Sequence, residues 1–168
     1  MRLITVINQK NIKIRIMKKT ILALAVMLTM GLTNAFANKG EEINQWAMAS
    51  FNKDFKGAKN VSWQQHKDYT KATFSLNNHV LFAYYNQEGE LLAVIRNVLS
   101  DQLPIRLLTE IKNKYTHYWI SELFEMATES QTTYYVTVEN SDEKIVLKSD
   151  GFDKWLVYKK EKKDSVVF

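Results

Sequence analysis

The sequence predicts an α+β domain in which two helices pack on one face of a curved, eight-stranded antiparallel sheet. Apolar residues recur at helical spacing in two segments, and four runs of alternating apolar and polar residues follow each segment. Short turns separate the runs, which makes consecutive strands antiparallel neighbours. Because the order helix–four strands occurs twice, we expect a tandem α-β4 repeat with units at about residues 41–98 and 101–160.

The first helix is predicted from an apolar stripe in steps of three and four residues. Trp46, Phe51 and Phe55 belong to this stripe, and we place them in the core. Gly57 lies just past the last of them, where a helix commonly ends. The second stripe runs over residues 105–115 and follows Pro104, which the first turn of a helix tolerates.

The strands are predicted from period-two alternation between turn signals. Asn77 and Asn78 form a two-residue hairpin signal, because asparagine tolerates positive φ. Gly89 and Gly151 mark corresponding turns 62 residues apart, which supports a duplication. The eight expected strands are 61–67, 69–76, 79–85, 90–98, 118–128, 132–139, 143–148 and 152–159.

The first 37 residues have the pattern of a signal peptide. Lys18 and Lys19 precede a short apolar run over residues 21–30, and a small-x-small site ends at Ala37. We therefore expect cleavage after Ala37, with Met17 as a possible true start in place of Met1. The run is short for a membrane span, which needs about 20 residues. A retained anchor is the alternative, but we expect a soluble product in the periplasm or outside the cell.

Charge and cysteine content exclude several classes of function. The chain has 23 basic and 18 acidic residues and a formal charge of +5. Six of the basic residues lie within residues 1–37, so the rest of the chain has 17 basic and 18 acidic residues. The basic character therefore gives no support for nucleic-acid binding. The absence of cysteine excludes disulfides, thiol catalysis and thiolate metal sites.

No residue pattern indicates catalysis, a cofactor or a metal. The histidines His66, His79 and His117 lack the spacing of a zinc-binding helix, although His66 and His79 could meet on neighbouring strands. No serine is flanked by glycines as in a nucleophile elbow, and there is no glycine-rich phosphate loop. We therefore expect no enzymatic activity, no cofactor and no metal.

A set of motifs in the first unit resembles the PepSY-like proteins exported by Bacteroidetes-type bacteria. These motifs are Phe51-x3-Phe55-x-Gly57, Asn60-Val61-x-Trp63, Tyr69-x4-Phe74, Ala83-Tyr84-Tyr85-x3-Gly89 and Leu103-Pro104. The resemblance covers most of residues 41–160. It implies a fold similar to that of the β-lactamase inhibitory protein, with two α-β4 units on one sheet and no catalytic residues. That inhibitory protein carries disulfides and this chain has none, which weakens the case for inhibition of a β-lactamase.

Aromatic side chains are the candidate binding residues. If they share the open face of the sheet, they form a rigid surface of the kind that anchors protein partners. The alternative is that they only shield strand backbones. The candidates for the open sheet face are Trp63, Tyr69, Tyr85, Tyr135 and Trp155. The strand alternation leaves the side of Trp63 and of Trp155 open, so we expect one of the two on this face.

The pattern favours an exported, non-enzymatic binding protein. Residues 38–168 would form a single PepSY-like domain that engages an exported protein or peptide. A peptidase-inhibitor-like role is one form of this binding that the family resemblance implies. The alternative function is a small-ligand carrier or sensor, because a concave sheet can cup an apolar ligand.

Overall fold

The computed structural model describes residues 42–152 and 154–163. These residues belong to one compact unit that spans residues 42–168. The expected signal peptide, its cleavage after Ala37 and the alternative start at Met17 lie outside the described residues.

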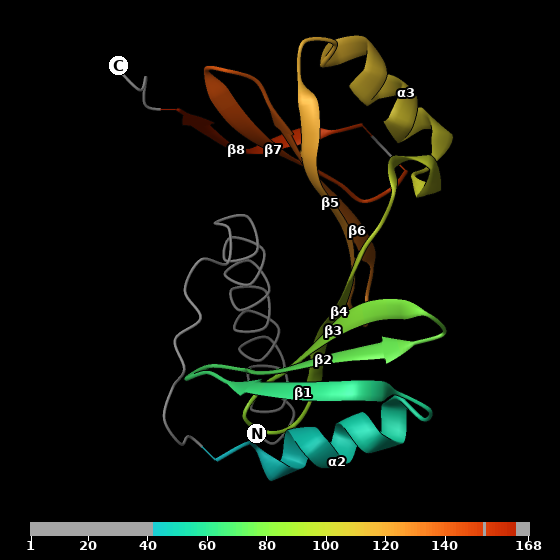
Figure 1. The fold of residues 1–168 in the computed structure, drawn as a ribbon, viewed down its shortest axis with the longest axis vertical. Coiled ribbons are helices and arrows are strands. Elements are labelled where there is room, and N and C mark those ends of the chain that lie inside the picture. The colour runs from blue at the N-terminus through green and yellow to red at the C-terminus, as the bar shows by residue number, and fades with distance from the viewer. Residues whose placement is uncertain (1–41, 153, 164–168) are drawn as a thin grey trace, which may run out of the picture. The chain divides into compact units, whose positions relative to one another are not determined.

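The described chain contains two α-helices and one eight-stranded sheet (Figure 1). Every strand pairs antiparallel with the next one in the sequence, so the strand order is β1 to β8 without a crossover. This confirms the expected α+β class and the antiparallel meander. In chain order, the elements are α2 (Gln45–Asp54), β1 (Lys59–Gln65), β2 (Thr70–Leu76), β3 (His79–Tyr85), β4 (Leu91–Asn97), a 3-10 turn (Ser100–Gln102), α3 (Ile105–Lys114), β5 (Trp119–Ala127), β6 (Thr132–Glu139), β7 (Glu143–Ser149) and β8 (Leu156–Lys162).

The turn residues adopt the conformations that their types favour. Asn77 and Asn78 have φ of 50° and 63° between β2 and β3, which confirms the two-residue hairpin. Gly89 and Gly151 have φ of 77° and 89° in the turns that lead to β4 and β8. The last strand differs most from its expected range, because β8 begins at Leu156 and not at Phe152.

Both helices cover the same face of the sheet. Ala83 in β3 pairs with Val94 in β4, and Val94 pairs with Ala127 in β5. Directly paired residues lie on one face, and residues an even number of positions apart along a regular strand share it. Ala83 packs with α2, whereas Leu123, four residues before Ala127, packs with α3. We call this side the helix-covered face.

The core under α2 is built mainly from aromatic rings. Phe51 contacts Phe55, Trp63 and Phe74 at ring-centroid distances of 5.3, 5.1 and 4.9 Å. Small residues lie beneath these rings, because Ala72 and Ala83 pair directly in β2 and β3. Trp46 was expected in this core but is 72% exposed. The buried side of α2 is set by Ala47 and Phe51, one turn apart, which leaves Trp46 on the solvent side.

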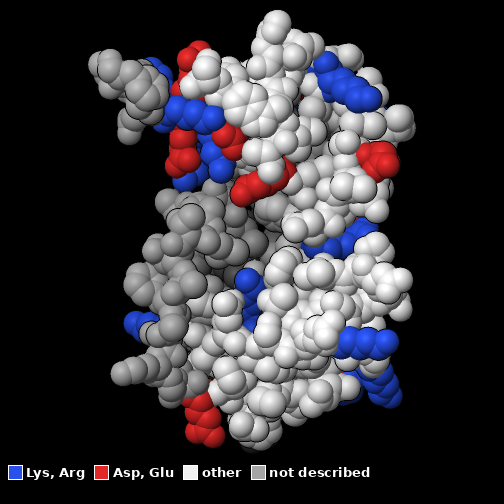
Figure 2. Space-filling view, viewed as in Figure 1, with Lys and Arg blue, Asp and Glu red and all other residues white. Residues whose placement is uncertain are grey.

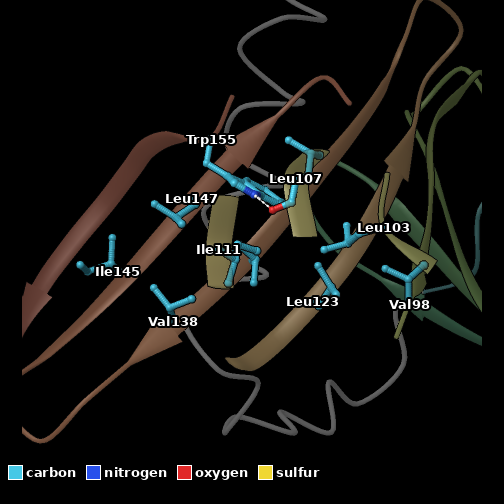
Figure 3. Close-up of a cluster of buried hydrophobic side chains, with 10 residues drawn as sticks. Val98, Leu103, Leu107, Ile111, Leu123, Val138, Ile145, Leu147 and Trp155 are labelled. Atoms are coloured by element: carbon cyan, nitrogen blue, oxygen red, sulfur yellow. Dashed lines mark hydrogen bonds between the residues drawn. The ribbon is translucent and has the colours of Figure 1, made fainter. Parts of the chain in front are cut away.

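The core under α3 is largely aliphatic (Figure 3). Leu107 and Ile111 point from the helix toward the sheet, where they meet β-branched and leucine side chains of β5 to β7. Trp155 enters the same core from the segment before β8, and its indole Nε1–H donates to the Leu107 carbonyl at 2.9 Å. The buried members of this core are Val98, Leu103, Leu107, Ile111, Leu123, Val136, Val138, Ile145, Leu147 and Trp155.

Candidate functional site

The opposite side of the sheet, which we call the helix-free face, carries a continuous apolar centre. Phe82 in β3 pairs with Ile95 in β4, and Ile95 pairs with Met126 in β5. In the neighbouring row, Phe124 in β5 pairs with Tyr135 in β6. The side chains that define the helix-free face are Lys71, Phe82, Tyr84, Ile95, Phe124, Met126, Tyr135 and Lys148.

Aromatic rings organise the β5–β8 part of this face. The rings of Phe124 and Tyr135 stack with centroids 5.0 Å apart and an interplanar angle of 16°. Tyr158 meets Tyr135 edge-on at 5.6 Å. Burial raises the pKa of Tyr135, with a smaller effect from the neighbouring Tyr158, so its hydroxyl stays neutral at physiological pH.

The helix-free face has the side chains of a protein interior, although neither described helix covers it. Tyr84, Ile95, Phe124, Met126 and Tyr135 are all at most 5% exposed. In a domain with one helical layer, the other sheet face is usually polar and solvated. Their burial therefore does not come from the helical layer, which packs on the helix-covered face.

Two lysines accompany the apolar centre, one on β2 and one on β7. The Nζ of Lys71 lies 4.9 Å from the centroid of the Phe82 ring and 5.9 Å from that of Tyr84. The Nζ of Lys148 lies 5.8 Å from the Tyr135 ring. Burial lowers the pKa of Lys71, which is only 8% exposed.

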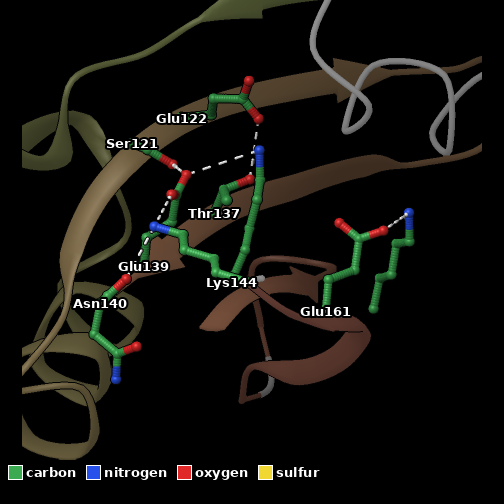
Figure 4. Close-up of polar contacts among 9 residues, drawn as sticks. Ser121, Glu122, Thr137, Glu139, Asn140, Lys144 and Glu161 are labelled. Carbon is green, nitrogen blue, oxygen red and sulfur yellow. Dashed lines mark hydrogen bonds and ion pairs between the residues drawn. The ribbon is translucent and has the colours of Figure 1, made fainter. Parts of the chain in front are cut away.

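A polar cluster lies at the end of β5 to β8 away from this centre (Figure 4). The Thr137 hydroxyl donates to Glu122 at 3.1 Å, and Glu139 accepts from Ser121 and from Lys163. Lys144 approaches Glu139 at 3.7 Å. Hydrogen bonds from Lys163 and Ser121 hold the pKa of Glu139 below its usual value. Figure 2 shows basic and acidic side chains mixed in this part of the surface, so the cluster neutralises itself.

Two of the five candidate residues lie on the helix-free face. Tyr135 is at its centre, as described above. Tyr69 precedes β2, and its ring lies 5.7 Å from that of Tyr84 and stacks on His66 at 4.4 Å.

The expected placement is wrong for Trp63, Tyr85 and Trp155, which lie on the helix-covered face. Trp63 packs edge-on against Phe51 of α2, and Tyr85 is fully buried in the same core. Trp155 is buried under α3. Strand β3 is apolar on both faces, so its alternation separates Tyr85 from Tyr84 without showing which of them faces the helix. Trp155 precedes its strand, where alternation does not apply.

Sequence reasoning missed Lys71, Phe82, Phe124, Met126 and Lys148 as members of the helix-free face. A signal for them exists in the strand patterns. In β5, the apolar residues Leu123 and Phe124 are adjacent in the sequence, which indicates a strand with apolar side chains on both faces. The lysines carry no such signal, because an alternating lysine normally indicates a solvated face.

The histidines do not form a site. His66 follows β1 and stacks on Tyr69, whereas His79 pairs with Leu76 at the hairpin between β2 and β3. These positions lie at opposite ends of β2, roughly 20 Å apart at the usual rise per residue. Among residues 42–152 and 154–163, no three metal-ligating side chains come together.

A shallow groove of about 460 Å³ runs along the outer side of α3, lined by Ile105, Thr109, Glu110 and Lys154 among others. It contains an ion pair between Lys114 and Glu110 at 2.8 Å. Glu110 is also held by the Trp155 backbone N–H, so these charges serve the packing of α3. No helix in the described part of the chain is both long and apolar enough to cross a membrane.

Solved structures with the same fold come from Bacteroides species. A β-lactamase-inhibitory-protein-like protein of Bacteroides fragilis superposes with a TM-score of 0.64 at 17% identity, covering 77% of this chain and 95% of that one. A DUF2874 family protein of Bacteroides ovatus gives a TM-score of 0.63 at 18% identity, covering 73% and 89%. A candidate periplasmic protein of Bacteroides eggerthii gives 0.64 at 12% identity, covering 73% and 90%.

No protein-family model and no curated protein sequence matches the chain. The PepSY-like resemblance is therefore not confirmed by these comparisons. The structural likeness covers most of the described residues at low sequence identity, which establishes the fold alone. The chain therefore has a fold like that of the β-lactamase inhibitory protein.

Proposed function

We propose that this chain is an exported, non-enzymatic binding protein that engages an exported protein or peptide through its helix-free face. The observation that carries the proposal is the interior-like composition of that face, where no described helix packs. A protein partner would pack on this face at Phe82, which is partly exposed. Buried tyrosine, phenylalanine and methionine side chains are typical of the centres of protein interfaces.

Export is supported by the signal-peptide pattern of residues 1–37 and by the description of a structural neighbour as a candidate periplasmic protein. A peptidase-inhibitor-like role is supported by the resemblance to PepSY-like proteins and by a neighbour that is like the β-lactamase inhibitory protein.

The tandem α-β4 origin of the fold is part of the proposal. Each helix precedes four strands and packs on the same side of the sheet. Gly89 and Gly151 occupy the turn before the last strand of each half, both with positive φ. This correspondence supports a duplication, with units at about residues 41–98 and 101–160.

A photo-crosslinking experiment tests the binding face. A photoreactive phenylalanine analogue replaces Phe82 on the helix-free face or, as the matched control, Ile105, which is 74% exposed on α3. Both variants are produced from the full sequence in a host that exports the protein. We expect a defined protein or peptide adduct from position 82 and none from position 105.

The same experiment separates the proposal from the alternative functions. Identical adducts from both positions, or no adduct from position 82, would overturn the proposed face.

Native mass spectrometry of the purified protein addresses the alternative small-ligand carrier or sensor. A retained small molecule that protects position 82 from crosslinking would replace a protein partner with a carrier role.

A further inference from the structure

The groove along α3 is open to solvent. Ile105 is 74% exposed, and Arg106, Thr109 and Lys154 are exposed as well. The lining side chains of α3 form two neighbouring rows with a spacing of four residues, one beginning at Ile105 and the other at Arg106. Lys154 lines the groove from the segment before β8. A dissolved molecule can therefore reach the lining without any movement of the helix.

The described lining carries more positive than negative charge. It contains the cationic side chains of Arg106, Lys114 and Lys154 but only one carboxylate, that of Glu110. Lys114 pairs with Glu110 at 2.8 Å, and the other carboxylate oxygen accepts from the Trp155 backbone N–H at 3.2 Å. Arg106 and Lys154 form no ion pair with a carboxylate of the described residues. Two positive charges of the groove are therefore left without a bonded counter-charge.

Glu110 stays ionised and is already occupied. Burial opposes its ionisation, but hydrogen bonds from Lys114 and Trp155, together with the charges of Lys114 and Lys154, hold its pKa below the usual value. Its carboxylate is therefore committed to the packing of α3, and an additional anion in the groove would be attracted by Arg106 and Lys154.

The groove also offers apolar surface. The Ile105 side chain lies at one end of the α3 lining, and the aliphatic stems of Arg106 and Lys114 add to it. Asn113 contributes an exposed amide that can donate a hydrogen bond. The volume of about 460 Å³ lies within the range of small-molecule sites, which is about 300–1,000 Å³.

We propose that the α3 groove binds a small amphipathic carboxylate, with the carboxylate group near Arg106 and Lys154 and the apolar body along Ile105. The carboxylate would supply the negative charge that the described lining lacks, through charged hydrogen bonds of the strong class. The site is separate from the helix-free face, so this inference goes beyond the proposed function. Because the ligand is a small molecule, the absence of a protein or peptide adduct at position 105 remains the expected result.

Other ligand classes use only part of the groove. An inorganic anion would pair with Arg106 and Lys154 and leave Ile105 in water. A neutral apolar molecule would cover Ile105 but would remove water from the two cations without replacing it, which costs free energy. A molecule with an apolar body and one carboxylate uses both features.

Three probes with the same eight-carbon chain test the charge assignment. They are octanoate, octanamide and octylammonium, titrated near neutral pH into the full-sequence, ¹⁵N-labelled protein after export and purification. NMR follows the backbone amide signals of Glu110 and Lys154. We expect octanoate to shift both signals saturably and to bind about tenfold more tightly than octanamide, with octylammonium weakest. The indole signal of Trp46, which is 72% exposed on α2, reports non-specific association and should not saturate.

Variants locate the ligand on the protein. Arg106→Gln and Lys154→Gln are each expected to weaken octanoate by about fivefold and to leave octanamide unchanged. Both positions are exposed, so the fold is retained. Ile105→Ser should weaken octanoate and octanamide alike, because it removes apolar contact. The matched control is Lys112→Gln, which removes an exposed cation of α3 outside the groove and should change neither affinity.

The outcomes separate this inference from the proposed function. Equal affinities for octanoate and octanamide overturn the charge assignment, as does octanoate binding that neither Arg106→Gln nor Lys154→Gln weakens. Saturable shifts at Trp46 without shifts at Glu110 overturn the location of the site. Each of these results leaves the position-82 adduct as it was, and loss of that adduct overturns the proposed function without changing the expected octanoate titration.

Discussion

The two halves of the sheet hold their helices in different ways. In the first half, α2 is fixed at its beginning. The Asn44 side chain accepts from the backbone N–H groups of Trp46 and Ala47, and its Nδ2 donates to the Gln87 carbonyl at 2.8 Å. The Asn44 backbone N–H also donates to Gln65 at 3.1 Å. One residue therefore caps the helix and ties it to the end of β1 and to the turn between β3 and β4.

In the second half, α3 is fixed at its middle. Pro104 precedes the helix and provides no side-chain cap. Trp155 instead inserts under the helix, where its indole N–H reaches the Leu107 carbonyl and its backbone N–H reaches Glu110. The anchor thus comes from a residue 48 positions after Leu107, next to the last strand.

The cores beneath the helices differ correspondingly. Phe51, Phe55 and Phe74 fill the first core over a floor of alanines, whereas leucine, isoleucine and valine fill the second. Cores tolerate such exchanges when the total volume is preserved. The comparison teaches that different anchors and different core residues can hold the same order of elements, a helix followed by four strands, against one face of a sheet.

The largest expected effect is the removal of the α3 anchor. Trp155→Ala creates a cavity and deletes the bond to Leu107, and should lower the free energy of unfolding by about 3–5 kcal/mol. Trp155→Phe keeps most of the volume and should cost about 1–3 kcal/mol. Urea denaturation measures both. Trp46→Ala in α2 is the control, because that side chain is 72% exposed and its loss should stay within about 0.5 kcal/mol. Equal losses at both tryptophans would contradict the anchoring role.

The glycine turns give the next largest difference between the halves. A Cβ at Gly89 would lie 2.7 Å from the Trp46 backbone, whereas at Gly151 it would meet only the Tyr134 ring at 3.0 Å. Gly89→Ala should therefore cost about 2–4 kcal/mol, combining left-handed strain with a clash against a helix backbone. Gly151→Ala should cost less because a side chain can move.

Gly57→Ala isolates the strain contribution. Its φ is 86° and no atom lies within 4 Å of the added Cβ. We expect a loss of about 1–2 kcal/mol in the same urea experiment. A Gly89→Ala variant no less stable than Gly57→Ala would show that α2 moves freely over the turn, against the close packing described here.

Local chemistry predicted most of the fold. Turn residues and period-two patterns predicted the Asn77-Asn78 hairpin, the turn at Gly89 and the antiparallel meander. The start of β8 did not, because Phe152 resembles a strand residue but is 86% exposed in the turn before Trp155. Whether an apolar residue belongs to a strand or to the loop before it depends on tertiary packing, which a local pattern does not contain.

The candidate site was predicted less well, for a physical reason. Period-two alternation separates Tyr84 from Tyr85 but does not identify the face on which a helix packs. When both faces are apolar, as in β3, the polarity that normally identifies the solvent side is absent. Tyr135 was placed correctly because Val136 and Val138 mark the helix-covered face of β6. Lys71 and Lys148 could not be found, since only the register shows that they accompany apolar neighbours.

A smaller effect is expected at the cap of α2. Asn44→Ala removes the acceptor for two backbone N–H groups and the donor to Gln87, and should cost about 1–2 kcal/mol. Asn44→Asp keeps the acceptor and loses only the donor, so it should retain more than half of this stability. Thermal unfolding of the two variants measures the difference. If Asp is as harmful as Ala, the tie to Gln87 and not the cap holds the start of α2.

The smallest effect concerns two tyrosines that face the helices from different halves. The Tyr85 hydroxyl is buried under α2 without a hydrogen-bond partner among the described residues. Burial, with a smaller contribution from Asp54, raises its pKa. Tyr85→Phe removes an unsatisfied group and should be neutral or stabilising by up to about 1 kcal/mol. The Tyr118 hydroxyl instead donates to Glu143 near α3, so Tyr118→Phe should be the less stable variant. Urea midpoints in the reverse order would mean that Tyr85 has a partner, such as a buried water, that stabilises the first half.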